Sequence, residues 1–543
     1  MVFLLFVPKL KPFFSRNLAR APALAAAGAI ALFIWICSQF YLPGEGFTYL
    51  VQFGSLNHDR FLPELQAVNH FELPNLDGYD GQYYAQIAMR PAVRDPELAR
   101  AVDSLSYRAR RILLCWTAYA LAGGNPVRAL HIFAVQNLVC WLILSVLLWR
   151  WFPPNSWGNW ARWAGVLFSF GLCTSVRGSL VDGPSLLLIA AAGALLESGW
   201  PWLGAGLLGL AGLAKDTNLL AAAALLPAHN SRAGWRRASA RIALAALPLA
   251  TWALVLWEWL GAGGAGARNF GFPLAAYWEK WAATLGEWGS QGFDFRTRGD
   301  VLVLVALTTQ VIFIAARPRW REAWWRIGAA YAVLMVFLGD AVWEGFPGAA
   351  PRVLLPLTLA FNILVPRRKA WWIVLLLGNL SVLVSPDALP FPGRESYEVS
   401  GPRHLRIIPE NGRIVEAVFD AQWEPPEKSW LEYYRWSRGP ATIAFRNPHP
   451  FAVVADISFA LRTHDPRAVS VRHGGDVLWR GALRPDEPRL VELPQVRLEP
   501  GDTVWEFSSD APAAASSAGN GQERAFSIRN LKLALHESAG GPP

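Results

Sequence analysis

The sequence predicts a polytopic α-helical membrane protein with about eleven transmembrane helices, followed by a C-terminal β-sandwich domain outside the cytoplasm. The first observation is composition: the 543-residue chain is 53% hydrophobic and only 17% charged, and its mean hydropathy is +0.24. A soluble protein of this size carries more charge. Apolar runs recur along residues 21–388, and short alternating runs follow from about residue 393. We therefore divide the chain into a membrane domain, 1–392, and a β domain, 393–543.

The N-terminal segment predicts a signal anchor. The run 21–42 is long enough to cross a hydrocarbon core of about 30 Å, and no small-residue cleavage site follows it. The basic residues around its start predict a cytoplasmic N-terminus; they are Lys9, Lys11, Arg16 and Arg20. Residues 43–107 are polar and punctuated by proline, so we expect them to form a large first loop outside the cytoplasm.

The remaining membrane segments follow from hydropathy and from the placement of basic residues. Further apolar runs lie at 109–123, 129–149, 160–177, 182–197, 201–214, 217–228, 241–260, 299–316, 326–343, 350–365 and 370–388. Arginine and lysine cluster at 232–241, 317–326 and 367–369, and such clusters are typical of cytoplasmic loops. This places a second loop, 261–298, and everything after residue 388 outside the cytoplasm.

Two threadings of the first half both give eleven crossings. In the first, 109–123 crosses the membrane and 201–228 is a single broken crossing. In the second, 109–123 lies along the membrane and 201–228 is a hairpin of two short crossings. We favour the second, because it brings Asp182, Lys215 and Asp216 to the side on which Asp80 lies, and ionisable groups within a membrane are usually functional.

The C-terminal region alternates apolar and polar residues with a period of two, which is typical of strands with one buried face. Seven strands are expected, at 441–445, 453–461, 469–471, 477–479, 489–493, 503–507 and 526–535. Glycine and proline separate them at the spacing of a β-sandwich. The stretch 511–521 is small and polar, and we expect a flexible loop there.

Composition also excludes several functions. The formal charge of +9 comes from arginines between apolar runs, as in cytoplasmic loops, so a nucleic-acid partner is not expected. All four cysteines lie inside apolar runs without metal-ligand spacing. No two histidines are spaced to form a metal-binding pair on one helix face, and His58, next to Asp59 in the first loop, is the single histidine that is a candidate for function.

The strongest candidate site is the segment Gly78-Tyr79-Asp80-Gly81-Gln82-Tyr83-Tyr84 in the first loop. It places a carboxylate near a membrane surface, and its glycines allow the backbone to turn sharply. The three tyrosines offer flat faces that can stack on a sugar. The alternative is an interfacial turn with a tyrosine belt, since aromatic residues are enriched at membrane interfaces for other reasons.

Three arginines follow this segment in the sequence, and such residues are suited to bind a phosphorylated donor. Arg108, Arg110 and Arg111 can hold phosphate oxygens through charge-assisted hydrogen bonds. Asp80 would then accept a proton from an attacking hydroxyl, or ligate a divalent cation. The alternative for the arginines is snorkelling at the start of an apolar helix.

Three further polar positions interrupt apolar runs. Asp182 precedes Gly183 and Pro184, so capping of a helix is an alternative to a role in the site. The charged pair Lys215-Asp216 must meet water, each other or a ligand, and a simple hairpin turn is the alternative. Arg352 is a second candidate phosphate ligand or a snorkelling arginine.

At these residues the chain resembles the GT-C superfamily of membrane glycosyltransferases, in a bacterial branch that carries the Tyr-Asp-Gly-Gln motif. The matching segments are 78–84, 107–113, 181–184, 213–217 and 351–356. Distant relatives by this resemblance are the aminoarabinose transferase and the protein O-mannosyltransferases. It implies a polyprenyl-phosphate sugar donor, with Asp80 as the catalytic carboxylate and Asp182 as a second acidic residue of the cavity. Arg110 or Arg111 would bind the lipid phosphate.

The resemblance also completes the functional prediction. It implies a glycosyltransferase that moves a sugar to a lipid, glycan or protein acceptor at the outer face of the bacterial inner membrane, with both loops and the β domain in the periplasm. The first loop lacks the paired acids of some branches, so no cofactor is implied beyond a candidate divalent cation. The predicted substrate-binding residues are Tyr79, Gln82, Tyr83, Tyr84, Arg108, Arg110, Arg111, Lys215, Asp216 and Arg352. The alternative is a transporter or flippase of lipid-linked glycans, which also use charged residues at broken helices.

Overall fold

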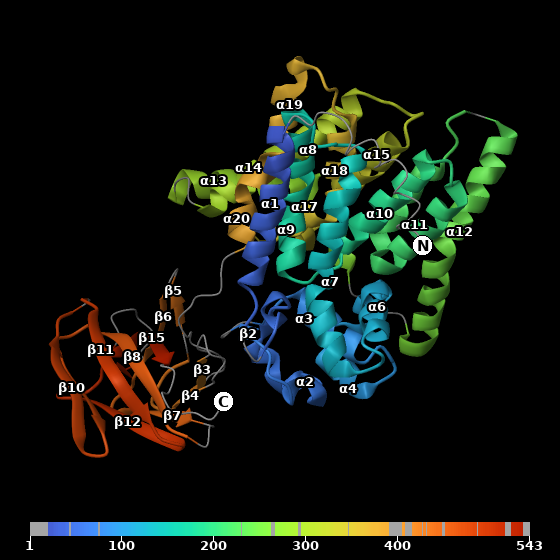
Figure 1. The fold of residues 1–543 in the computed structure, drawn as a ribbon. Helices are drawn as coiled ribbons and strands as arrows, with labels where there is room; N and C mark the ends of the chain where they lie inside the picture. The colour runs from blue at the N-terminus through green and yellow to red at the C-terminus, as the bar shows by residue number, and fades with distance from the viewer. Residues whose placement is uncertain are drawn as a thin grey trace. The chain divides into compact units, whose positions relative to one another are not determined.

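The computed structural model divides the chain into two compact units (Figure 1). One unit comprises residues 1–39 and 83–390, and the other comprises 40–82 and 391–543. The structure describes residues 20–42, 45–73, 77–229, 231–261, 266–291, 295–345, 347–389, 404–407, 415–425, 427–429, 432–447, 451–485, 487–515 and 523–535. Lys9, Lys11 and Arg16, the predicted domain boundary at 392–393 and most of the predicted loop 511–521 lie outside these residues.

The first unit is helical throughout its described residues. Its α-helices are α1 (Arg20–Ser38), α4 (Pro96–Ala101), α5 (Leu105–Arg108), α6 (Leu113–Leu121), α7 (Pro126–Leu147), α8 (Trp157–Leu167), α9 (Phe170–Arg177), α10 (Asp182–Glu197), α11 (Pro201–Ala214), α12 (Arg232–Leu260), α13 (Ala275–Gln291), α14 (Phe295–Ala316), α15 (Ala323–Val336), α16 (Asp340–Trp343), α17 (Ala350–Val353), α18 (Leu355–Leu364), α19 (Trp372–Leu377) and α20 (Ser385–Ala388). The 3-10 helices are η5 (Ala109–Arg111), η6 (Leu148–Arg150), η7 (Asp216–Leu225), η8 (Ala267–Asn269), η9 (Lys369–Trp371) and η10 (Leu380–Val384). The division between the units falls inside α3 (Asp80–Met89).

Four of the described helical segments are long and apolar enough to cross a membrane. They are Ala21–Ser38, Pro126–Arg150, Arg232–Leu260 and Arg296–Ala316. The helix pair Lys369–Leu377 and Leu380–Ala388, bent by 44°, would make a fifth if it is one span. These segments are candidate membrane spans by length and composition, and the predicted count of eleven crossings is not confirmed.

The count is unconfirmed because several predicted crossings are broken into short helices. The run 160–177 becomes α8 and α9, which are interrupted at Ser169, a residue with extended backbone. The run 201–228 is likewise interrupted at Lys215. Hydropathy does not detect such breaks, because the flanking residues are as apolar as those of a continuous span.

The length of α6 bears on the choice between the two threadings. It has nine residues, so it is about 13 Å long, less than half of the hydrocarbon core. Residues 109–111 before it form the separate η5. The short α6 agrees with a segment 109–123 that lies along the membrane, but α11 and η7 are also shorter than a full crossing, so the choice between the two threadings stays a prediction.

The C-terminal region consists of two sheets (the orange and red strands of Figure 1). The six-stranded sheet has the order β10 (Asp476–Leu483), β9 (Arg467–His473), β12 (Gly501–Ser509), β7 (Ala441–Asn447), β4 (Val415–Phe419) and β3 (His404–Ile407). The five-stranded sheet has the order β11 (Arg489–Leu498), β8 (Val453–Arg462), β15 (Ser527–Leu535), β6 (Glu432–Trp436) and β5 (Glu427–Ser429). The small pair β13 (Ala514–Ala515) and β14 (Glu523–Arg524) completes the described strands.

The two sheets share one apolar core, as expected of a sandwich. Burial alternates along β8, and the buried residues of both sheets form a single cluster. Phe507 of the first sheet contacts Phe459 of the second with ring centroids 5.8 Å apart. Each of the seven predicted strands matches a described strand, because period-two burial is a strong signal. The sequence analysis did not predict β3, β4, β5 and β6, where the alternation is short.

A buried charged cluster as candidate active site

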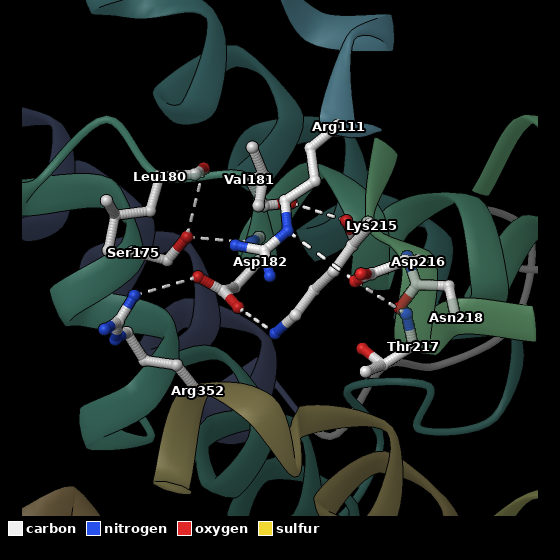
Figure 2. A network of polar contacts seen from close by, with 12 residues as sticks. Arg111, Ser175, Leu180, Val181, Asp182, Lys215, Asp216, Thr217, Asn218 and Arg352 are labelled. Atoms are coloured by element: carbon white, nitrogen blue, oxygen red, sulfur yellow. Dashed lines mark hydrogen bonds and ion pairs between the residues drawn. The ribbon is translucent and has the colours of Figure 1, made fainter. Parts of the chain in front are cut away.

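Six charged side chains, from four helical elements and the link between α11 and η7, converge on one network, which Figure 2 shows in part. We call it the charged cluster, and its members are Arg110, Arg111, Asp182, Lys215, Asp216 and Arg352. Asp182 accepts from Lys215 Nζ at 2.5 Å and from Arg352 Nη1 at 3.2 Å. Asp216 pairs with Arg111 Nε at 3.6 Å and Arg110 Nη1 at 4.0 Å. All six are residues that the sequence analysis proposed.

Asp182 is the first residue of α10, but it does not cap that helix. Residue Val181 occupies the cap position, and no side-chain capping bond is formed there. The carboxylate instead places one oxygen on Lys215 and the other on Arg352. The Asp182 side chain is only 4% exposed, so both cations are needed to offset the loss of hydration. The capping interpretation is therefore wrong for Asp182.

Neutral hydrogen bonds hold the turn that carries Asp182. The Asn137 side chain, from α7, donates to the carbonyls of Ser175 and Leu180, both at 2.6 Å. The Ser175 hydroxyl in turn accepts from the Gly183 N–H at 2.8 Å. A Cβ at Gly183 would lie 2.5 Å from Asn137 Oδ1, so only glycine lets the two helices approach this closely. The carboxylate is thus placed by backbone that two other helices fix.

Lys215 and Asp216 do not pair with each other. Lys215 has extended backbone, with φ −158° and ψ 124°, between the end of α11 and the start of η7. Neighbouring side chains on extended backbone point to opposite sides. Lys215 therefore reaches Asp182 while Asp216 reaches the arginines of η5. The hairpin-turn alternative correctly places a chain break here, but these side chains form ion pairs within the protein and do not simply face water.

Arg111 is held by two tyrosine hydroxyls as well as by Asp216. Its Nη1 donates to Tyr84 at 2.9 Å, and its Nη2 donates to Tyr107 at 2.8 Å. The Arg111 side chain is 12% exposed, whereas that of Arg110 is 35% exposed. Hydroxyl groups satisfy the donors of a guanidinium without neutralising its charge. Snorkelling to an interface does not describe Arg111, which lies inside the protein.

Arg352 lies on α17, and a glycine on α9 allows this short helix to approach. A Cβ at Gly171 would collide with the carbonyl of Pro351 and would lie 2.8 Å from the Arg352 nitrogen. The Arg352 side chain is 9% exposed, so snorkelling is excluded for it as well. The position of this cation depends on backbone contact between α9 and α17.

The charged cluster contains four cationic side chains and two carboxylates, and each cation lies within 4.0 Å of one of these carboxylates. Three of the cations are arginines, whose guanidinium groups match the geometry of phosphate oxygens. The cluster is therefore rich in the side chains that bind phosphate.

The segment around Asp80 belongs to the other unit and is ordered by its own loop. Gly78 has φ 77°, and a Cβ there would collide with the Gly54 nitrogen. Gln82 is buried; its Oε1 accepts from Gly54 N–H at 3.1 Å, and its Nε2 donates to the Asp77 carbonyl at 2.6 Å. The Gln82 side-chain amide thus connects this segment to Gly54 and Asp77. That Asp80 shares a cavity with the charged cluster stays a prediction.

The tyrosines and Arg108 have different environments from those expected. Tyr84 is 1% exposed, so it cannot stack on a sugar, and its hydroxyl instead holds Arg111. Arg108 forms two hydrogen bonds with Asp103, at 3.0 and 2.8 Å, so its charge is already compensated. Its guanidinium also lies 5.0 Å from the ring centre of Tyr83. Tyr79 donates its backbone N–H to the Gln52 carbonyl at 2.9 Å, and a sugar contact by Tyr79 or Tyr83 stays a prediction.

Four positioning residues of the charged cluster were not predicted: Tyr107, Asn137, Gly171 and Ser175. A signal existed for Asn137, because it is a polar side chain within the long apolar run 129–149. Tyr107 adjoins the arginines in the sequence, and its hydroxyl also accepts from Asn269 at 2.9 Å. Gly171 and Ser175 give no such signal, since small residues are common in apolar helices.

Comparison with known proteins gives little further information. No protein-family model matches the chain, and no curated protein matches it. Among solved structures it is similar to the arabinosyltransferase EmbB from Mycobacterium smegmatis, with a TM-score of 0.38 and 11% identity. The match covers 94% of this chain but 64% of EmbB, so the chain spans less than two thirds of that protein. A likeness at this level establishes neither fold nor activity, and the function has to be argued from the charged cluster.

Proposed function

We propose that the chain is a membrane glycosyltransferase that moves a sugar from a polyprenyl-phosphate donor to a lipid, glycan or protein acceptor. We place the reaction at the outer face of the bacterial inner membrane. The observation that carries the proposal is the convergence of four cationic side chains, Arg110, Arg111, Lys215 and Arg352, in the charged cluster of a unit that contains candidate membrane spans.

The charge of the cluster suits the change of charge in this reaction. A sugar phosphodiester carries one negative charge, and the polyprenyl phosphate that leaves carries up to two. Cations fixed before the reaction stabilise the charge that develops as the bond breaks. Arg111 is already oriented by Tyr84 and Tyr107, so it loses little conformational freedom when it binds phosphate. Arg110, the more exposed of the pair, would meet the phosphate first.

The two carboxylates have different proposed roles. The two carboxylate oxygens of Asp182 accept hydrogen bonds from Lys215 and Arg352, so we assign Asp182 to positioning those cations. Asp80 would act as the base: it takes the proton of the acceptor hydroxyl while that oxygen bonds to the anomeric carbon. The bond from this carbon to the phosphate oxygen breaks in the same step, and the configuration inverts.

The test uses the full chain in lipid with a polyprenyl-phosphate sugar, and it measures release of polyprenyl phosphate together with labelled acceptor. Asp80→Asn should reduce the rate about 10²- to 10⁴-fold, the range for loss of a general base. Asp77→Asn is the matched control, because Asp77 is an exposed acid three residues away, and its rate should not change. An Asp80→Asn protein with full activity contradicts the assignment of the base.

The second candidate, a transporter or flippase of lipid-linked glycans, rests on the same convergence of cationic side chains. A cationic cluster in a helical unit can also hold the phosphate of a lipid that crosses the membrane. Vesicles that contain the purified chain separate the two functions. Movement of the lipid-linked sugar between leaflets without sugar transfer would support the transporter and contradict the transferase.

A further inference from the structure

Three side chains of the first loop converge on one point. His58 Nδ1 lies 2.7 Å from Glu72 Oε1, and His70 Nε2 lies 3.0 Å from the same oxygen. One ligand atom from each of the three residues lies within 4.8 Å of both others. We call His58, His70 and Glu72 the loop triad. Only His58 attracted attention in the sequence, because the other two follow 12 and 14 residues later without a helical or CxxC-type spacing.

Local structure fixes each member of the loop triad. Glu72 lies on β2 (Glu72–Leu73), which pairs in parallel with β1 (Phe53–Gly54), and His58 lies in η4 (Ser55–Arg60). The nitrogen Nδ1 of His70 is 2.8 Å from the Val68 carbonyl. A carbonyl can only accept, so Nδ1 carries a proton, and Nε2 is the ring nitrogen that faces Glu72. A backbone carbonyl behind the histidine is typical of metal ligands.

The surroundings of the loop triad are largely dry, with one open side. The side chains of His70 and Glu72 are 2% and 3% exposed, whereas that of His58 is 43% exposed. Phe53 and Phe61 present ring edges or faces to His70, with centroids at 5.0 and 5.8 Å. Two buried ligands and one exposed ligand provide a preformed site with an entry path for an ion.

We propose that the loop triad is a binding site for a divalent transition metal of the Zn²⁺ type. Two imidazoles and one carboxylate suit zinc, whereas calcium and magnesium prefer oxygen ligands alone. Tetrahedral zinc at about 2.1 Å from each ligand separates neighbouring ligand atoms by about 3.4 Å. The distance between His58 and Glu72 would have to widen by about 0.7 Å, which rotation of the half-exposed His58 can provide. The distance between His70 and Glu72 would have to widen by about 0.4 Å, through a small shift of these two buried side chains. Three protein ligands leave one position for water.

The bound metal would stabilise the part of the loop that carries Asp80. Asn57, next to His58, donates to the Asp77 carbonyl at 2.7 Å, and Gln82 donates to the same carbonyl at 2.6 Å. β1, paired with β2, is also joined to Gln82 through the Gly54 N–H. The metal would therefore link η4 to β2; η4 contacts the segment 77–82 directly, and β2 is connected to it through its partner strand β1. This role does not depend on the proposed sugar transfer, because metal content and loop order are measured separately from activity.

The first test measures metal content of the full chain in detergent. The protein is stripped with a chelator, dialysed against Zn²⁺ and analysed by elemental mass spectrometry. We expect about one zinc per chain. His70→Gln should weaken zinc binding at least 10- to 100-fold, the loss seen when even a supporting partner of a metal ligand is removed. His473→Gln, an exposed histidine of β9, is the control and should retain the zinc. Absence of zinc in the wild-type chain, or equal binding by His70→Gln, overturns the proposal.

Two further measurements use only the wild-type chain, so their outcome does not depend on whether a variant folds. Co²⁺ bound by two imidazoles and a carboxylate gives visible absorption bands, and these should disappear when Zn²⁺ is added; a chain without bands overturns the site.

Hydrogen exchange tests the structural role. Chelation should speed exchange of the Gly54 and Tyr79 amides, which bond within this loop, and should not affect the Phe445 amide of β7. Unchanged exchange at Gly54 and Tyr79 overturns the stabilising role.

Discussion

The charged cluster and the loop triad are both largely buried polar groups, but they offer different atoms to a ligand. The cluster holds four cationic side chains and two carboxylates, whereas the triad holds one carboxylate and two imidazoles. The first offers N–H donors that match phosphate oxygens, and the second offers nitrogen and oxygen atoms that can ligate a metal ion. The difference teaches that the kind of polar atom predicts the ligand better than the number of polar residues does.

The supports of the two groups also differ. Members of the charged cluster come from elements far apart in the sequence, such as α10 and α17, and depend on helix packing. The loop triad comes from residues 58–72 and depends on one short parallel strand pair. Changes in helix packing should therefore affect the cluster and leave the triad intact, which makes the comparison testable.

The largest expected effect is on stability when Asp182 is replaced. Asp182→Asn leaves Lys215 and Arg352 buried without their shared carboxylate, and such a change destabilises a protein by about 3–5 kcal/mol. Thermal unfolding in detergent measures this loss. Asp340→Asn, an exposed aspartate at the start of α16, should change stability by less than about 0.5 kcal/mol. Equal melting temperatures for the two variants would show that the cluster is not under electrostatic constraint.

Stabilisation by added ligands tests whether the charged cluster binds an anion and the loop triad binds a metal cation. Zn²⁺ or a short polyprenyl phosphate, at about 100 times its dissociation constant, should each stabilise the wild-type chain by about 2.7 kcal/mol. Arg111→Ala should lose the effect of the lipid phosphate and keep that of Zn²⁺, and His70→Gln should do the reverse. Melting curves with each ligand give the four combinations. Loss of both effects in one variant would contradict the separation of the two sites.

Helix packing at the cluster is tested by Gly171→Ala. The added methyl collides with the Pro351 carbonyl and displaces the backbone of Arg352, so we expect a loss of about 1–3 kcal/mol and reduced sugar transfer. Zinc binding should not change. Gly206→Ala on α11 is the control, because nothing lies within 4 Å of its added Cβ and alanine favours a helix. If Gly171→Ala is as active and stable as Gly206→Ala, the close approach of α9 and α17 is not required.

The smallest effect is expected for Arg111→Lys, which keeps the charge. Lysine cannot donate to Tyr84 and Tyr107 in the same geometry, and one lost hydrogen bond is worth about 0.5–1.5 kcal/mol. Donor binding should weaken by about 2- to 10-fold, with a larger loss for Arg111→Ala. Titration with the lipid phosphate measures both. Arg128→Lys, an exposed position on α7, should bind as the wild type does. Identical binding by Arg111→Lys and wild type would show that the charge of Arg111 matters for donor binding and that its hydrogen-bond geometry does not.

The β strands and the charged residues were predictable from the sequence for different reasons. Period-two burial identifies a strand such as β8 without any knowledge of its partner strands. Asp182 and Lys215 stood out because charge within an apolar run needs a partner. The sequence could not name the partner, since a run of equally apolar helices offers no information on which of them pack together.

The breaks within apolar runs and the loop triad could not be predicted. Continuous hydropathy concealed the end of α8 at Leu167 and the end of α11 at Ala214, so crossings were counted where the helices are short. The loop triad depends on the parallel pairing of β1 with β2, two strands of two residues each. Such short strands carry no periodic signal, and only the folded loop brings His70 and Glu72 to His58.

The extended backbone at Lys215 has a consequence for insertions and deletions. The extended backbone points two adjacent side chains of opposite charge toward different partners: Lys215 pairs with Asp182, and Asp216 pairs with Arg111. Which partner each charge meets therefore depends on its exact position along this link. Removal of Ala214 would move Asp216 to the position that faces Asp182 and Thr217 to the position that faces Arg111, which would set two acids against each other and replace the acid beside Arg111 with a hydroxyl. The segment should therefore tolerate many changes of neighbouring apolar side chains but no change of length.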